Sequence, residues 1–112
     1  MRWILWLALL PGLAFGLTDT LTGTSDESAG VGLPDGKGGY LISGEFDGAT
    51  CTLQFQGKNA TWYDVAAVTV DDVAAINWDA SVSARVACTG AAVSMNLYIE
   101  IQCMSRSCRD GP

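Results

Sequence analysis

The chain has 112 residues, of which 49% are hydrophobic and 16% charged, and its formal net charge at pH 7 is -6. This length suits one domain with one core, and the composition is that of a folded chain rather than a disordered tail. The basic residues are scattered, which argues against nucleic-acid binding, because that needs clustered Lys and Arg. The sequence has no histidine, so Ser-His-Asp and Cys-His catalysis and histidine metal ligation are excluded.

Residues 1–16 form an apolar leader. Arg2 supplies positive charge, an unbroken apolar run follows, and Ala14-Phe15-Gly16 places small residues at a cleavage position. These features are typical of a secretory signal peptide, and the apolar run is shorter than the ~20 residues that a transmembrane helix needs. We therefore expect no stable membrane span. The alternatives are an uncleaved hydrophobic arm that docks on a partner and a start codon assigned too far upstream.

The first half of the remaining chain predicts three strands. Residues 17–39, rich in Thr, Ser, Asp and Gly, predict a first strand followed by a loop. Residues 40–46 and 49–56 predict two further strands. Asp47-Gly48 between them is a dipeptide that favours a tight turn, so the two strands are expected to form a β-hairpin.

Four more strands are predicted in the second half, separated by turn signals. They span residues 61–68 (or to 70), 73–78, 81–88 and 93–102. The strand at 73–78 is the weakest, because Ala74-Ala75 has low β-propensity. The strand at 93–102 is the strongest, since its odd-numbered residues are apolar and its even-numbered residues polar, which is the period of a half-buried strand.

About seven short strands without helical periodicity predict an all-β fold, a single antiparallel β-sandwich of the immunoglobulin-like or jelly-roll kind. The sandwich is expected to span residues 17–102. Residues 103–112 are expected to form a cysteine-containing C-terminal tail.

The chain has four cysteines, an even number, which after a leader suggests an oxidising compartment and disulfides. Cys51 and Cys88 fall on the inward faces of predicted core strands, where a bridge could join sheet to sheet. Two buried free thiols are the alternative. Cys103 and Cys108 could close a small loop in the tail. The spacing lacks the paired knuckles of a structural zinc site.

The acidic residues do not suggest catalysis or metal binding. Asp71-Asp72 are neighbours on a predicted turn, where side chains diverge and Asp is favoured for local reasons. A calcium site built from Asp35, Asp47, Asp71 or Asp72 would need several converging oxygens, and no calcium-loop spacing is present. We expect no catalytic residues, no metal and no cofactor.

Three aromatic residues are candidates for binding. Trp62, Tyr63 and Trp78 could form a platform for sugar rings. Residues of this kind also serve as core or interface anchors, and we favour that interpretation.

Short motifs in residues 39–55, 61–65 and 83–90 form a recognisable set. A strand ending in Gly44-Glu45-Phe46 is followed by one reading Gly-Ala-Thr-Cys-Thr-Leu-Gln, then by Thr-Trp-Tyr-Asp-Val and by an Arg-Val strand that ends near Gly90. The set resembles small structural proteins of tailed bacteriophages and covers residues 38–101. The resemblance implies a virion component, such as a capsid decoration, head-fibre or tail-associated protein, and supplies no catalytic or binding residue.

Two hypotheses follow. The first is a non-enzymatic virion subunit that binds neighbouring subunits, and copies of itself, through a face and exposed strand edges of the sandwich. The second is a secreted or envelope bacterial binding domain, held by disulfides and directed at carbohydrate. The leader and the cysteines favour the second hypothesis, because they indicate export.

Overall fold

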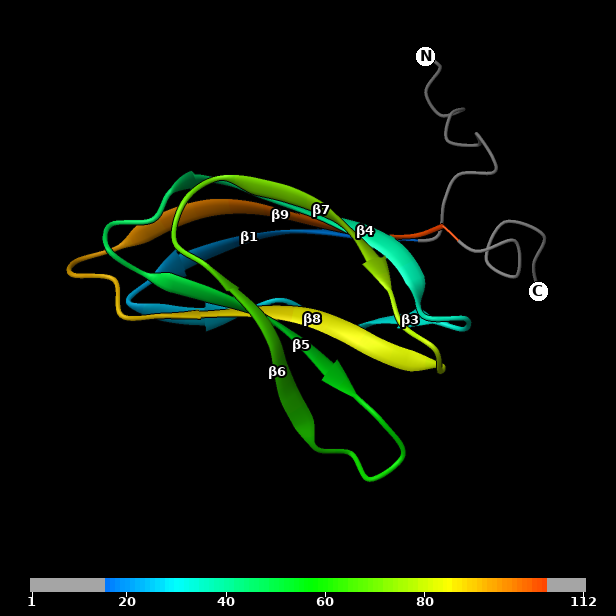
Figure 1. Ribbon diagram of the computed structural model, residues 1–112. Helices are drawn as coiled ribbons and strands as arrows, with labels where there is room; N and C mark the ends of the chain where they lie inside the picture. Colours follow the sequence, from blue (N-terminus) through cyan, green and yellow to red (C-terminus); the bar gives the residue numbers. More distant parts are fainter. Residues whose placement is uncertain (1–15, 105–112) are drawn as a thin grey trace, which may run out of the picture.

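The computed structural model describes residues 16–104, and this part of the chain consists of β-strands without a helix (Figure 1). The strands are β1 (Gly16–Gly23), β2 (Ser25–Glu27), β3 (Val31–Leu33), β4 (Lys37–Glu45), β5 (Thr50–Gln56), β6 (Trp62–Val68), β7 (Asp72–Asn77), β8 (Val82–Thr89) and β9 (Met95–Cys103). Residues 16–104 accordingly contain no helix long and apolar enough to cross a membrane. The predicted leader and most of the predicted tail lie outside the described residues.

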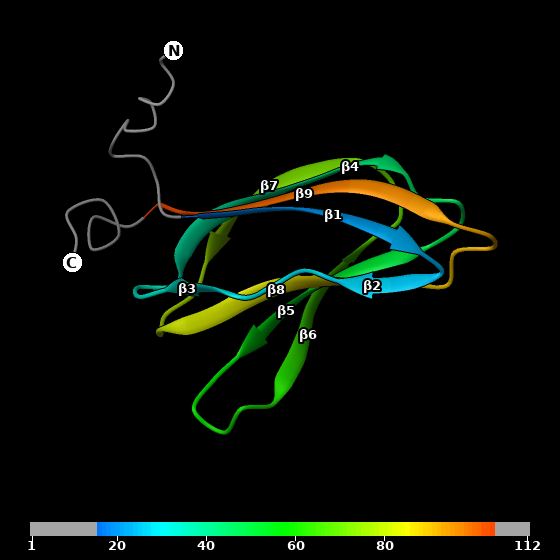
Figure 2. The same ribbon diagram turned by 180° about the vertical axis from the view of Figure 1, so that it is seen from behind.

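Two antiparallel sheets pack face to face, and this confirms the predicted β-sandwich. One sheet has the strand order β1-β9-β4-β7, and the other has the order β2-β8-β5-β6, with β3 also paired to β8. Figures 1 and 2, which view the molecule from opposite sides, show the first sheet lying over the second. Strands β6 and β7 are the edges on one side of the sandwich, and β1 and β2 are the edges on the other.

The strand order is that of a jelly roll. Strands pair in a nested series, β1 with β9, β2 and β3 with β8, β4 with β7 and β5 with β6. This series is one long double ribbon whose tip is the loop of residues 57–61. Rolling the ribbon brings β9 against β4 and β8 against β5, which are the two remaining pairs. The topology therefore selects the jelly-roll alternative over the immunoglobulin-like one.

The core lies where the inward faces of both sheets meet. On β9 the odd-numbered residues from Met95 to Ile101 are at most 1% exposed, and on β8 Ala84 and Val86 are fully buried. The predicted period-two alternation of these strands is thus confirmed, and each fully buried Leu or Ile contributes roughly 1.5–3 kcal/mol of transfer free energy.

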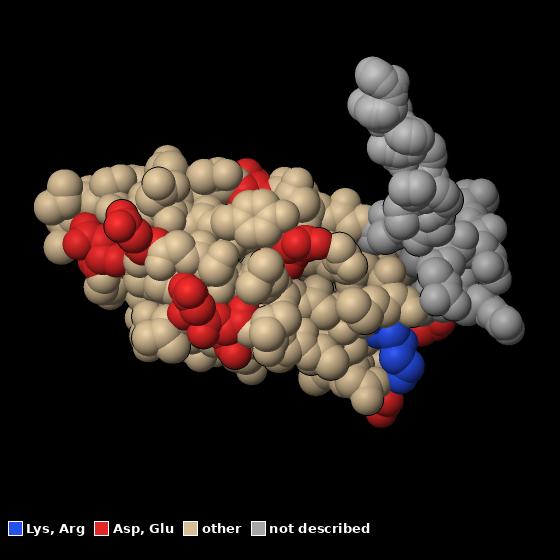
Figure 3. All heavy atoms as spheres, turned by 90° about the horizontal axis from the view of Figure 1, so that it is seen from above, with Lys and Arg blue, Asp and Glu red and all other residues tan. Residues whose placement is uncertain are grey.

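The outer faces are acidic but not densely charged. Residues 16–104 contain 11 Asp and Glu and 3 Lys and Arg, counted from the sequence. Figure 3, which looks down on the sheet that contains β9, shows acidic side chains in separate places within a largely uncharged surface, and basic side chains only near one end. Such a surface favours solubility and does not attract phosphate groups.

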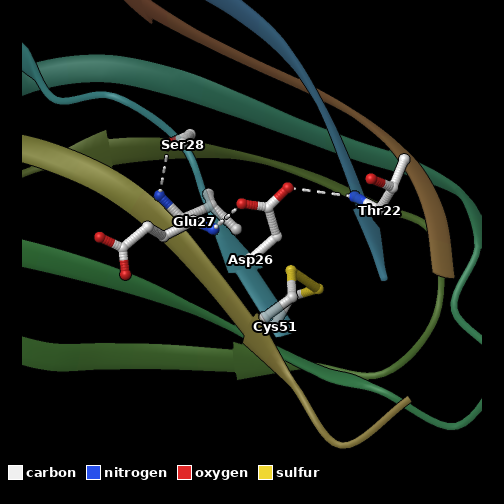
Figure 4. Close-up of a disulfide and its surroundings, with 7 residues drawn as sticks. Thr22, Asp26, Glu27, Ser28 and Cys51 are labelled. Carbon is white, nitrogen blue, oxygen red and sulfur yellow. Dashed lines mark hydrogen bonds between the residues drawn. A yellow bond between two sulfur atoms is a disulfide. The ribbon is translucent and has the colours of Figure 1, made fainter. Parts of the chain in front are cut away.

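The structure has nine strands where the sequence predicted about seven, because the segment expected to be a loop forms β2 and β3. Both pair with β8, and Ser28 fills the gap between them. The Ser28 N–H donates to the Val86 carbonyl (2.8 Å), and the Ser28 hydroxyl accepts from the Val86 N–H (3.0 Å; Figure 4). A side-chain oxygen thus replaces a main-chain acceptor, so the ladder continues through a polar sequence of low β-propensity.

The Asp47-Gly48 turn is not a hairpin, and this prediction was wrong. The turn joins β4 to β5, which belong to different sheets. Both residues have positive φ, 51° and 84°, as in a tight turn, but the Asp47 carboxylate accepts hydrogen bonds from the N–H groups of Val93 (2.7 Å) and Ser94 (2.9 Å). The turn is therefore fixed to the connection between β8 and β9. For the same reason β9 begins at Met95, and Val93, predicted to begin that strand, is exposed.

A disulfide joins Cys51 to Cys88, as one of the two alternatives predicted, but it does not join the two sheets. The two residues are direct partners on the neighbouring strands β5 and β8, with Cα atoms 4.0 Å apart, and both are fully buried (Figure 4). The jelly-roll order makes β5 and β8 neighbours in one sheet, a pairing that local sequence periodicity does not predict. Cys103 is buried and is not a free thiol, while Cys108 lies outside the described residues.

Candidate interaction surface

The large apolar side chains that remain exposed are concentrated on one side of the sandwich. Five of the eight in the described part of the chain belong to the segment that runs through β6 and β7, namely Tyr63, Val65, Val70, Val73 and Trp78. Exposed alanines of the same two strands lie between them. We call residues 62–78 the β6–β7 side. Single exposed apolar residues need no explanation, but a concentration along one segment that forms two sheet edges is typical of an interaction surface.

Strand β6 is exposed because its hairpin with β5 diverges from the opposite sheet (Figure 1). The register of β6 against β5 shifts between Leu53 and Gln54, which marks a bulge that bends the strand. Tyr63 lies opposite the buried Phe55, yet 53% of Tyr63 is exposed. The inward-facing side of β6 is thus left partly uncovered by the other sheet.

Strand β7 borders a shallow apolar hollow on the outer face of its sheet. The hollow measures about 440 Å³ and is lined mainly by Leu41, Val73, Ala75 and Met104 over the bare backbone of Gly39. A Cβ atom at Gly39 would approach the Met104 Cε to 3.2 Å, so glycine leaves room for the methionine to lie across the sheet. The sequence pattern does not predict this hollow, because its lining comes from three strands and the only local signal is Gly38-Gly39.

The three predicted binding aromatics do not form one platform. Trp62 lies opposite Gln56 on the outer face of its sheet, and the Arg85 guanidinium carbon stacks 4.2 Å from the centre of its ring. Trp78, by contrast, makes an edge-on contact with the core residue Phe55, with ring centroids 5.3 Å apart, while 47% of Trp78 remains exposed. Only Tyr63 and Trp78 therefore lie on the Phe55 side of the sheet.

Arg85 is the centre of a polar network that crosses the outer face of the second sheet. Its Nε donates to Gln54 Oε1 (2.8 Å), and its guanidinium forms a salt bridge with Glu27 (3.0 Å). Gln54 in turn donates to Asp64 Oδ1 (2.8 Å) on the edge strand β6. With Trp62 stacked on the guanidinium, these groups satisfy one another, so the network ties β2, β8, β5 and β6 together rather than leaving polar groups open to a ligand.

Three of the four carboxylates considered for catalysis or calcium binding accept hydrogen bonds from other parts of the fold, Asp47 and Asp71 from the backbone and Asp72 from a side chain. Asp71 accepts the Gly44 N–H (3.1 Å), and Asp72 accepts the Tyr40 hydroxyl (2.8 Å). Burial, the hydrogen bond and the negative charge of Asp72 raise the pKa of Tyr40 to about 12. The hydrogen bonds that Asp47 accepts from the N–H groups of Val93 and Ser94 lower the pKa of its carboxyl group. Within residues 16–104, no three acidic or cysteine side chains come together in a way that could hold a metal ion.

The chain matches no protein-family model, no curated protein and no solved structure.

Proposed function

We propose that this protein is a non-enzymatic virion subunit that packs against neighbouring subunits through its β6–β7 side. The observation that carries the proposal is the concentration of exposed apolar side chains on these two edge strands, which a protein partner would bury. The tailed-phage setting rests on the motifs in residues 39–55, 61–65 and 83–90. A jelly-roll sandwich is compatible with that setting, although the fold alone does not assign a function.

The test is incorporation into particles. Virions are purified from a host that carries the gene, and the chain is quantified by targeted mass spectrometry. Tyr63→Asp and Val65→Asp place charge on the β6–β7 side and are expected to reduce the copy number per particle. Thr20→Asp, an exposed change on the opposite edge strand β1, is the matched control and should leave the copy number unchanged. Absence of the native chain from virions refutes the proposal.

A second candidate is an exported binding domain directed at carbohydrate. The buried Cys51–Cys88 disulfide favours it, because disulfides persist in oxidising compartments. If this candidate is right, the intact mass of the natural protein corresponds to the chain without its leader, and all of its cysteines resist alkylation. Because Tyr63 and Trp78 lie apart from Trp62, Trp78→Ala should abolish binding on a glycan array while Trp62→Ala should not. The absence of any glycan signal, with thiols open to alkylation, excludes this candidate.

A further inference from the structure

Among the four sheet edges, β7 is the least protected against pairing with another strand. The edge beside β8 consists of two three-residue strands, β2, which carries Asp26 and Glu27, and the uncharged β3, and β1 carries Asp19 near its middle. Strand β6 is bulged and carries Asp64. In contrast, β7 runs for six residues with a charge only at its first residue, Asp72, and no register shift against β4. Charges, short length and bulges are the devices that keep sheet edges from pairing, and β7 has almost none of them.

The backbone groups that β7 presents to a partner follow from its pairing with β4. The Trp78 N–H donates to the Gly36 carbonyl on the β4 side (2.8 Å). In an antiparallel pair, residues alternate between directing their N–H and C=O groups toward and away from the neighbouring strand. The even-numbered residues of β7 therefore bond to β4. The N–H and C=O groups of Val73, Ala75 and Asn77 point away from the sheet.

We propose that β7 of a second copy of this chain pairs antiparallel with this edge, around a two-fold axis at Ala75. In this register Ala75 lies opposite Ala75 of the second copy, and Val73 lies opposite Asn77 of the second copy. All three outward-pointing residues then form hydrogen-bonded pairs, and the two four-stranded sheets join into one. This inference names a second copy of the chain as one of the neighbouring subunits of the proposed function, and it therefore rests on that function.

The side chains of β7 are compatible with this register. Directly opposed residues share a face of the sheet, and residues 73–77 bring no charge into the pairing. Asp72 lies opposite Trp78 of the second copy in a non-hydrogen-bonded pair, where side chains are closest, so the half-exposed indole becomes covered. The apolar hollow beside Val73 and Ala75 then meets the two-fold axis.

Charge limits the length and the strength of the ladder. Just beyond β7, Asp71 lies opposite Asp79 of the second copy, so pairing does not extend past Asp72 and Trp78. Both copies are acidic overall, with 11 acidic and 3 basic residues in residues 16–104. Salt screens repulsion between exposed charges. The dimer is therefore expected to become tighter as salt concentration rises.

The oligomeric state of the full-length protein tests the inference first. Sedimentation over a range of concentrations should show a dimer that dissociates on dilution. Ala75→Pro removes an N–H that β4 does not use, so the fold should persist while the dissociation constant rises about tenfold or more. Ala75→Glu should act alike, and Thr18→Glu, the same charge on the exposed edge of β1, should leave the dimer intact. A circular dichroism spectrum confirms that each variant is folded.

Cysteine cross-linking tests the register. Opposed residues of a hydrogen-bonded pair have Cα atoms about 5.5 Å apart, which a disulfide can bridge. Ala75→Cys should give a covalent dimer on mild oxidation, and Thr18→Cys should not. Val73→Cys should cross-link with Asn77→Cys in a mixture but only weakly with itself. A monomer at all concentrations, a dimer unaffected by Ala75→Pro, or capture of a strand from a different virion protein at Ala75→Cys would overturn the inference. Incorporation of the chain into virions in any of these cases leaves the proposed function standing.

Discussion

The disulfide between Cys51 and Cys88 should be a major source of stability. It closes a segment with a sequence separation of 37 residues that contains β6, β7 and nearly all of β5 and β8. For a loop of this length, the lost entropy of the unfolded chain corresponds to about 4 kcal/mol at 25 °C. Domains of this size are stable by roughly 5–15 kcal/mol, so the bridge accounts for a large share of the total.

The perturbation is the double variant Cys51→Ala/Cys88→Ala, measured by urea unfolding and by thermal unfolding. We expect the free energy of unfolding to fall by about 4 kcal/mol. At roughly 4–8 °C per kcal/mol for a domain of this size, the melting temperature should drop by about 15–30 °C. The urea m-value should rise, because the unfolded chain without the bridge exposes more surface.

The single variant Cys51→Ala is the internal control. It already removes the bridge, so the second substitution should add little, and the two losses should be strongly non-additive. A loss of less than about 1 kcal/mol in the double variant, with an unchanged m-value, would refute the chain-entropy argument. Additive losses would mean that the two buried side chains matter through packing rather than through the bond between them.

Three further perturbations follow from individual contacts. Leu97→Asp places an unpaired charge in the core and should cost about 4 kcal/mol or more, a large share of the total stability, whereas Tyr98→Asp on the outer face of the same strand should change the melting temperature little. Tyr40 has a pKa raised from 10.0 to about 12, so its stabilising effect is complete below pH 10 and is lost as pH rises toward 12; Tyr40→Phe should remove this part of the alkaline loss of stability in urea titrations. The pKa of Asp47 is lowered, so its carboxylate stabilises the fold above about pH 4, and this stabilisation is lost as the pH falls. Asp47→Ala should therefore lower the melting temperature at pH 6 and have less effect at pH 3.

Local periodicity predicted the strands but not their partners. The alternation in β5, β8 and β9 predicted which residues are buried, because burial on one face of a sheet imposes a period of two. The Asp47-Gly48 dipeptide predicted a local turn geometry, which was correct, and a hairpin, which was not. Positive φ angles at two residues determine only the local geometry of the turn. Which strands pair is decided by distant contacts, here the hydrogen bonds that the N–H groups of Val93 and Ser94 donate to Asp47.

The candidate interaction surface was only partly predictable. Trp78 and Tyr63 stood out as aromatic residues in the sequence, but their separation from Trp62 depends on the register of β6 against β5. The low β-propensity of Ala74-Ala75 made β7 a weak prediction. In the structure the same two alanines are exposed on the edge strand, where a small uncharged side chain leaves the backbone accessible to a partner.

The unequal protection of the sheet edges determines what kind of assembly the domain can form. If β7 paired with β1 of the next copy, each addition would leave a new β7 edge open, and the chain would grow into a filament. Asp19 near the middle of β1 and the short acidic β2 beside it disfavour that arrangement, since an added strand would have to pass these charges. Pairing of β7 with β7 uses the same edge of both copies and closes after two. The acidic β1–β2 edges and the β7 edge, which is charged only at Asp72, are thus expected to act together, because the first disfavours open-ended growth and the second permits a single closed contact.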